Sequence, residues 1–81
     1  MERAEVLQVM REKAEQLLEV APEDVQEDKS FVDDLQVDSR SLVEYTMDLE
    51  DAFDIELPEE ELVDVKTIGA FVDVILAKTN A

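Results

Sequence analysis

The sequence contains no cysteine and no histidine among its 81 residues. These absences exclude a disulfide, a Cys/His zinc site, a serine–histidine pair and a cysteine nucleophile. Basic residues are scarce as well, with seven lysines and arginines against 23 acids and a net charge of −16. Such a charge argues against nucleic acid and anionic membranes as partners, because phosphates would repel the surface. We therefore expect neither a catalytic site of these kinds nor a dedicated metal site.

Long hydrophobic runs are also missing. No stretch approaches the ~20 apolar residues that a membrane span needs, and the first residues lack the basic start and apolar run of a signal peptide. The apolar content of 46% is nevertheless sufficient for a globular core. We expect one cytoplasmic domain over residues 1–81, monomeric and without membrane insertion.

Apolar residues at spacings of three and four predict a first helix over residues 2–19. Its predicted core face consists of Val6, Leu7, Met10, Ala14, Leu17 and Leu18. A long connection follows from Glu19 to Asp38, and it could hold a short helical turn near residues 30–34. Connections of this length are uncommon unless they have a function or are held in place. The residues expected to hold it against the core are Val20, Val25, Phe31, Val32 and Leu35.

A second helix is predicted from Ser39 to Phe53, with Asp38 as its N-cap. Steps of 100° place six residues on a core face: Leu42, Tyr45, Thr46, Leu49, Ala52 and Phe53. On the opposite face, Val43 and Met47 are expected to be exposed apolar side chains among carboxylates.

The last part of the chain predicts one short and one longer helix. Residues 54–57 should be extended because they precede Pro58, which can open a short helix that reaches about residue 63 or 64. Thr67 is a candidate N-cap for a final helix. Its apolar stripe is Ile68, Phe71, Val72, Ile75 and Leu76. The predicted fold is all-α: a small four-helix bundle of three main helices and one short helix, with a long first loop.

Ser39 stands where the acidic connection turns into the second helix. It is a weak nucleophile, because no histidine is available to activate it. Its hydroxyl could instead be a substrate that another enzyme modifies. From the residues alone, the simpler explanation is that Ser39 merely begins a helix, as serines often do.

A family resemblance favours modification. Asp38-Ser39, followed by Val43-Glu44, resembles the modification site of acyl carrier proteins. Three further runs resemble that family in order and spacing, and the resemblance covers nearly the whole chain. These runs are Phe-Val-Asp-Asp-Leu at 31–35, Leu-Glu-Asp-Ala-Phe-Asp-Ile-Glu-Leu-Pro at 49–58, and Thr-Ile-Gly at 67–69.

The resemblance implies a carrier protein that is not itself an enzyme. Its Ser39 would carry 4′-phosphopantetheine, added by a phosphopantetheinyl transferase. Acyl groups would then travel as thioesters for fatty-acid or polyketide biosynthesis, since the prosthetic group supplies the thiol that the chain lacks. In the family, the residue that matches Asp38 helps to hold metal and partner contacts during modification. Carriers of amino acids have a different, less acidic sequence before the serine, so we rank a carrier of amino acids lower.

The second helix is similar to the family's recognition helix. Glu44 and Glu50 match positions that meet basic residues of partner enzymes, and Val43 and Met47 match the apolar contacts between them. Expected partners are the transferase, acyl transferases, ketosynthases and other synthase enzymes with basic patches. Arg40 departs from the family, which usually has leucine after the modified serine, and we interpret it as a residue that affects partner choice.

The family also shelters its acyl chain between helices. The candidates to line such a cleft are Phe31, Leu49, Leu57, Leu62, Val65, Ile68 and Phe71, although an ordinary core role would explain most of them. A function of another class stays open beside the carrier: an unmodified acidic helical adaptor that binds basic protein partners.

Overall fold

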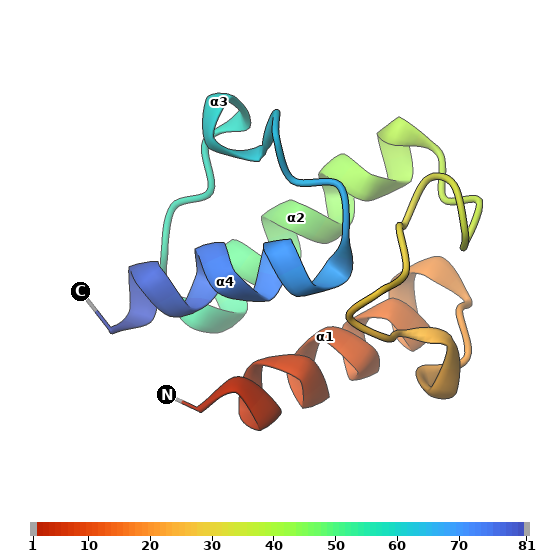
Figure 1. Ribbon diagram of the computed structural model, residues 1–81, viewed down its shortest axis with the longest axis horizontal. Helices are drawn as coiled ribbons and strands as arrows, with labels where there is room; N and C mark the ends of the chain where they lie inside the picture. The colour runs from red at the N-terminus through yellow and green to blue at the C-terminus, as the bar shows by residue number, and fades with distance from the viewer. Residues whose placement is uncertain (1, 81) are drawn as a thin grey trace.

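The computed structural model describes residues 2–80, so residues 1 and 81, the ends of the predicted domain, lie outside the described part. Its elements are α1 (Arg3–Leu18), the 3-10 turn η1 (Pro22–Asp24), α2 (Ser39–Phe53), α3 (Glu59–Leu62) and α4 (Ile68–Thr79) (Figure 1). No strand occurs within residues 2–80. The all-α prediction of three main helices and one short helix is confirmed.

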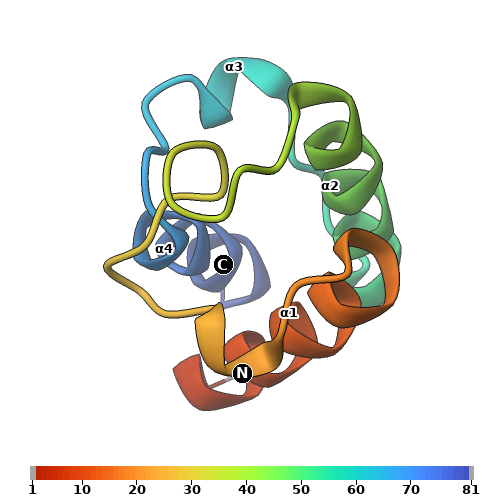
Figure 2. The same cartoon turned by 90° about the vertical axis from the view of Figure 1, so that its right-hand side faces the viewer.

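The three main helices surround a common interior. α1 packs against both α2 and α4, and the view along the other axis shows α1, α2 and α4 arranged around the core (Figure 2). The short helix α3 lies at the end of this arrangement opposite α1 (Figures 1 and 2). The long connection between α1 and α2 closes one side of the bundle.

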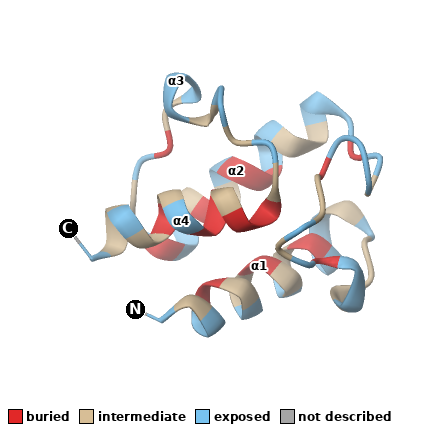
Figure 3. Ribbon diagram, in the orientation of Figure 1, coloured by how far each residue is buried: buried red, intermediate tan, exposed pale blue. Residues whose placement is uncertain are grey.

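The core consists of the inward stripes of the helices, as Figure 3 shows by burial. The buried helical residues are Val6, Met10 and Ala14 of α1, Tyr45, Thr46, Leu49 and Phe53 of α2, and Ile68, Gly69, Phe71, Val72 and Ile75 of α4. The buried hydroxyl of Tyr45 donates a hydrogen bond to the backbone oxygen of Met10 at 2.8 Å. This bond satisfies a polar group that would otherwise be costly to bury, and burial raises the pKa of Tyr45.

Three residues assigned to the core by sequence are exposed, and these predictions were wrong. Leu17 and Ala52 lie on the correct stripes, but each occupies the last turn of its helix. Periodicity predicts the direction of a side chain and not how far along the helix its neighbours extend. Val32 is 53% exposed, and Val37, which we did not assign to the core, is buried instead.

The α1–α2 connection is held in place mainly by three buried residues, Val25, Phe31 and Val37. Phe31 packs edge to face against Tyr45 of α2 and Phe71 of α4, with ring centroids 5.2 and 6.1 Å apart. Such aromatic pairs add stability beyond the area that they bury. Phe31 therefore joins the connection to both helices at once.

The segment near residues 30–34 forms a hydrogen-bonded turn and not a regular helix. The Ser30 hydroxyl accepts from the Asp33 N–H at 3.2 Å, while the Asp34 carboxylate accepts from the Ser30 N–H at 2.7 Å. The Asp34 N–H also donates to the Ser30 backbone oxygen at 3.1 Å, so these side-chain bonds accompany a single helix-like turn that does not continue as a helix.

The connection is also bonded to the start of α4. The backbone oxygens of Lys29 and Glu27 accept from the N–H groups of Ile68 and Gly69, at 2.8 and 3.0 Å. A Cβ at position 69 would meet the Glu27 oxygen at 3.0 Å. The glycine therefore permits a backbone approach that a larger residue would oppose.

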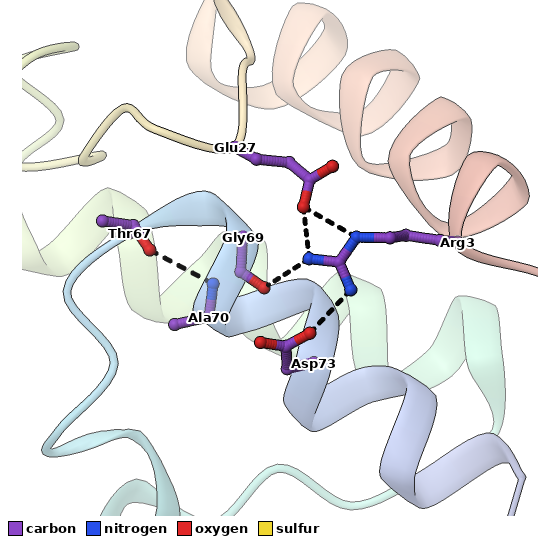
Figure 4. Close-up of polar contacts among 6 residues, drawn as sticks. All are labelled: Arg3, Glu27, Thr67, Gly69, Ala70 and Asp73. Carbon is purple, nitrogen blue, oxygen red and sulfur yellow. Dashed lines mark hydrogen bonds and ion pairs between the residues drawn. The ribbon is translucent and has the colours of Figure 1, made fainter.

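Arg3 links three elements beside this junction (Figure 4). Its Nε donates to the Glu27 carboxylate at 2.7 Å, its Nη1 to Asp73 of α4 at 2.6 Å, and its Nη2 to the backbone oxygen of Gly69 at 3.2 Å. The same carboxylate oxygen of Glu27 also pairs with Nη2. The hydrogen bonds from Arg3 lower the pKa of Glu27.

This link predicts a pH-dependent effect of Glu27→Gln. Because folding lowers the Glu27 pKa below its ordinary 4.5, the ion pair stabilises the protein above that value and is lost as the pH falls through the folded pKa. We expect Glu27→Gln to lower the melting temperature at neutral pH, and the difference from wild type to shrink below about pH 4.5.

Thermal melts between pH 3 and pH 8 provide the measurement. Glu15→Gln is the matched control, because Glu15 is an exposed glutamate of α1 without an ion pair among residues 2–80. A difference for Glu27→Gln that stays constant with pH would remove the ion pair as its cause.

Candidate functional site

Ser39 is the first residue of α2, and Asp38 determines where that helix begins. Asp38 has extended backbone angles, and its carboxylate accepts a hydrogen bond from the Ser41 N–H at 2.7 Å. The predicted N-cap is thus confirmed. The bond from the Ser41 backbone, followed by one from the Ser41 hydroxyl, lowers the pKa of Asp38.

The Ser39 side chain is exposed, and its hydroxyl makes no hydrogen bond to another residue of the described chain. The uncapped N–H groups of the first turn and the helix dipole lie beside it, an arrangement that favours a phosphate group. No basic side chain is bonded to the hydroxyl, so the geometry offers Ser39 as a group to be modified and not as an activated nucleophile.

A cavity of about 530 Å³ adjoins Ser39, between α2, the α1–α2 connection and the segment from α3 to α4. Cavities of this size accommodate small-molecule groups. Ser39 itself forms part of the wall. The apolar lining consists of Phe31, Val32, Leu42, Val43, Met47, Leu57, Leu62, Val65 and Phe71.

The cavity includes some of the predicted cleft residues and not others. Leu57, Leu62 and Val65 line it, together with Phe31 and Phe71. By contrast, Leu49 and Ile68 are fully buried in the core and lie outside it. The sequence did not place Leu42, Val32 or Thr46 in the cavity wall. Whether a space exists beside these residues depends on the path of the α1–α2 connection.

One face of α2 presents the remaining predicted residues. Val43 and Met47 are 58% and 60% exposed, as predicted, and Arg40 and Glu44 are exposed with them. Arg40 forms no ion pair within 4.0 Å among residues 2–80, with Glu44 or with any other acid. The face therefore has an apolar centre, carboxylates and one cation beside Ser39.

Two acids of α2 have contacts inside the protein that the sequence did not predict. Glu50 is half-buried, and its Oε2 accepts from the Leu57 N–H at 2.8 Å. Asp48 forms an ion pair with Lys13 of α1 at 3.2 Å. Glu50 thereby holds the extended segment that follows α2. Leu57 of this segment contributes to the cavity wall.

The described residues contain neither a metal-binding cluster nor a membrane-spanning helix. Residues 2–80 contain no group of three or more acidic side chains arranged to hold a metal ion. None of the helices in this part of the chain has the length and apolar character needed to cross a membrane.

An exposed serine at a capped helix start, beside a largely apolar cavity in a small helical bundle, suits a carrier domain that holds a covalently attached group. A family model described as the phosphopantetheine attachment site matches residues 8–75. An acyl carrier protein of Rubrobacter xylanophilus is 38% identical over 81 residues and covers 100% of both chains. A meromycolate extension acyl carrier protein of Mycolicibacterium aurum is 37% identical over 80% of this chain and 67% of its own.

A solved structure, the acyl carrier protein from Enterococcus faecalis, superposes with a TM-score of 0.76 at 33% identity. The match covers 96% of this chain and 99% of the other. The chain belongs to the acyl carrier protein family, and the prosthetic group of the matched attachment site is 4′-phosphopantetheine.

The Glu50 contact predicts that two substitutions there will differ in stability. Glu50→Gln keeps a side-chain oxygen that can accept from the Leu57 N–H. Glu50→Ala leaves that N–H without its partner and should lower the free energy of unfolding by about 1 kcal/mol. Urea unfolding of both variants measures the difference.

Glu44→Ala is the control, because Glu44 is exposed and makes no side-chain hydrogen bond within residues 2–80. Equal losses for Glu50→Ala and Glu50→Gln would mean that the carboxylate acts through its charge and not through this bond.

Proposed function

We propose that residues 1–81 act as one acyl carrier domain, with Ser39 as the attachment point of 4′-phosphopantetheine. The observation that carries this proposal is the exposed Ser39 hydroxyl at the start of α2, at the wall of a cavity of about 530 Å³. Membership of the family supports the kind of group attached. The domain itself catalyses no reaction.

Each residue near the attachment point has a separate task. The Ser39 oxygen becomes esterified to the phosphate, while Asp38 keeps the first turn of α2 in place through Ser41. When bound, the prosthetic group supplies a thiol that carries acyl groups as thioesters. The apolar wall of the cavity, including Leu57, Leu62 and Val65, shelters the acyl chain from water.

Partner enzymes dock on the exposed face of α2. Val43 and Met47 provide an apolar centre, and Glu44 and Glu50 provide charges for basic residues of the partner. These partners include a phosphopantetheinyl transferase, acyl transferases and ketosynthases with basic patches. With a net charge of −16, such contacts should form rapidly and weaken with salt.

The pathway is fatty-acid or polyketide biosynthesis. The relative named for meromycolate extension supports a role in lipid metabolism. We further propose that the protein acts as a monomer in the cytoplasm, where a fold without cysteine loses no disulfide to reducing conditions.

The proposal predicts a mass gain that depends on Ser39. Incubation with a phosphopantetheinyl transferase and coenzyme A should add one phosphopantetheine to the wild type and none to Ser39→Ala, as intact-mass spectrometry would measure. Ser41→Ala is the matched control: it lies two residues further along α2 and should still gain the group. No gain for the wild type would favour the unmodified acidic adaptor.

Arg40 predicts an effect on partner choice. It is an exposed cation next to Ser39 without an ion pair among residues 2–80. Arg40 should therefore repel the basic patches of enzymes whose surface is complementary to an apolar residue at this position. We expect Arg40→Leu to change kcat/KM several-fold with transferases and synthase enzymes, and to leave the melting temperature near that of the wild type. Unchanged rates with every partner would exclude Arg40 as a determinant.

A further inference from the structure

Thr46 is the one buried side chain of the polar or charged classes within residues 2–80, apart from the Tyr45 phenol. It is 8% exposed, and it lies in the wall of the cavity beside Ser39. Val43 and Met47, which flank the same stretch of α2, also contribute to this wall. Thr46 therefore adds a hydroxyl to a stretch of α2 whose other lining residues, Leu42, Val43 and Met47, are apolar.

The hydrogen bond of Thr46 determines what the hydroxyl can still do. Its Oγ1 donates to the backbone oxygen of Leu42 at 2.8 Å, and a hydroxyl has only one proton to donate. Its remaining capacity is that of an acceptor. A saturated hydrocarbon chain in the cavity would leave this oxygen without a further partner, whereas a chain with a hydroxyl group could donate to it.

Two other hydroxyls of the lining have the opposite capacity. Thr67 Oγ1 accepts from the Ala70 N–H, and Ser30 Oγ accepts from the Asp33 N–H, each at 3.2 Å. Both side chains line the cavity and keep a proton that they can donate. Among these three hydroxyls, that of Thr46 can only accept, whereas those of Thr67 and Ser30 can still donate, and a neutral group able to do both suits them.

The charges of the wall argue against an acidic cargo. Asp33, Glu50 and Glu59 contribute to the lining, and Lys66 is the only cation among the lining residues. A carboxylate on the acyl chain would be repelled by this excess of negative charge. A hydroxyl adds no charge and can still form hydrogen bonds.

We propose that this cavity selects acyl chains that bear a hydroxyl group over saturated chains of equal length, with Thr46 as the residue that accepts the hydrogen bond. The inference rests on the proposed attachment of the arm at Ser39 and specifies the cargo of that same site. The net contribution of one neutral hydrogen bond corresponds to a preference of about fivefold.

The test compares three cargoes on the intact protein. Ser39 is loaded with octanoyl, β-hydroxyoctanoyl or 7-hydroxyoctanoyl phosphopantetheine, and the rate of thioester cleavage by hydroxylamine is measured. Each rate is divided by that of the same acyl pantetheine free in solution, which removes intrinsic reactivity. On the wild type, at least one hydroxylated chain should be protected about fivefold more than octanoyl.

The variants assign the effect to one oxygen atom. Thr46→Val has nearly the same shape but no acceptor, and its preference should fall to about one, whereas Thr46→Ser should retain it. Loss of a hydroxyl bonded to the i−4 carbonyl does not destabilise a helix, so Thr46→Val should fold. Thr79→Val is the matched control, since the Thr79 hydroxyl also bonds a helix carbonyl, that of Leu76 at 3.3 Å, outside the cavity.

The outcomes separate this proposal from the one on which it rests. A wild type that protects all three chains equally overturns the selection of hydroxylated cargo without reference to any variant. A preference that survives in Thr46→Val or in Thr46→Ala overturns the role of Thr46. Failure of Ser39 to take up any arm, by intact mass, is instead a failure of the carrier function.

Discussion

The site depends on the junction between the α1–α2 connection and the start of α4. Two backbone hydrogen bonds, from Ile68 to Lys29 and from Gly69 to Glu27, hold the connection against α4. Phe31 then reaches the interior and contacts aromatic rings on both α2 and α4. Because one wall of the cavity consists of this connection, its position determines whether a sheltered space exists beside Ser39.

The distribution of charge supports the same arrangement. Four of the seven basic residues bond across elements, and they link α1 to the connection, to α2 and to α4, and α3 to α4. The four are Arg3, Arg11, Lys13 and Lys78. Ion pairs between exposed side chains are individually weak. Here each pair places a cation between segments that carry negative charge, and so reduces the repulsion between them. Most acids, among them Glu44 on the exposed face of α2, form no ion pair within residues 2–80.

The sequence predicted the features that depend on local chemistry. Asp38 and Thr67 could be identified as caps, and Val43 and Met47 as exposed residues, because capping and helical periodicity involve only near neighbours. The burial of Val37 in place of Val32, and the bond between Glu50 and Leu57, depend on the path of irregular backbone. Whether cleft candidates such as Leu49 line the cavity or fill the core depends on it too.

The proposed attachment point, Ser39, and the core residues of α2 lie on different turns of that helix. Ser39 lies at the exposed first turn, whereas Tyr45 and Leu49, further along the helix, are completely buried. A group attached at Ser39 therefore replaces solvent and not packed side chains. In the proposed function, only the acyl chain would have to enter the protein, at the cavity that Thr46 and apolar residues line. The two proposed tasks of α2, modification and selection of cargo, would therefore not disturb its core face, because they involve different turns and faces of the helix.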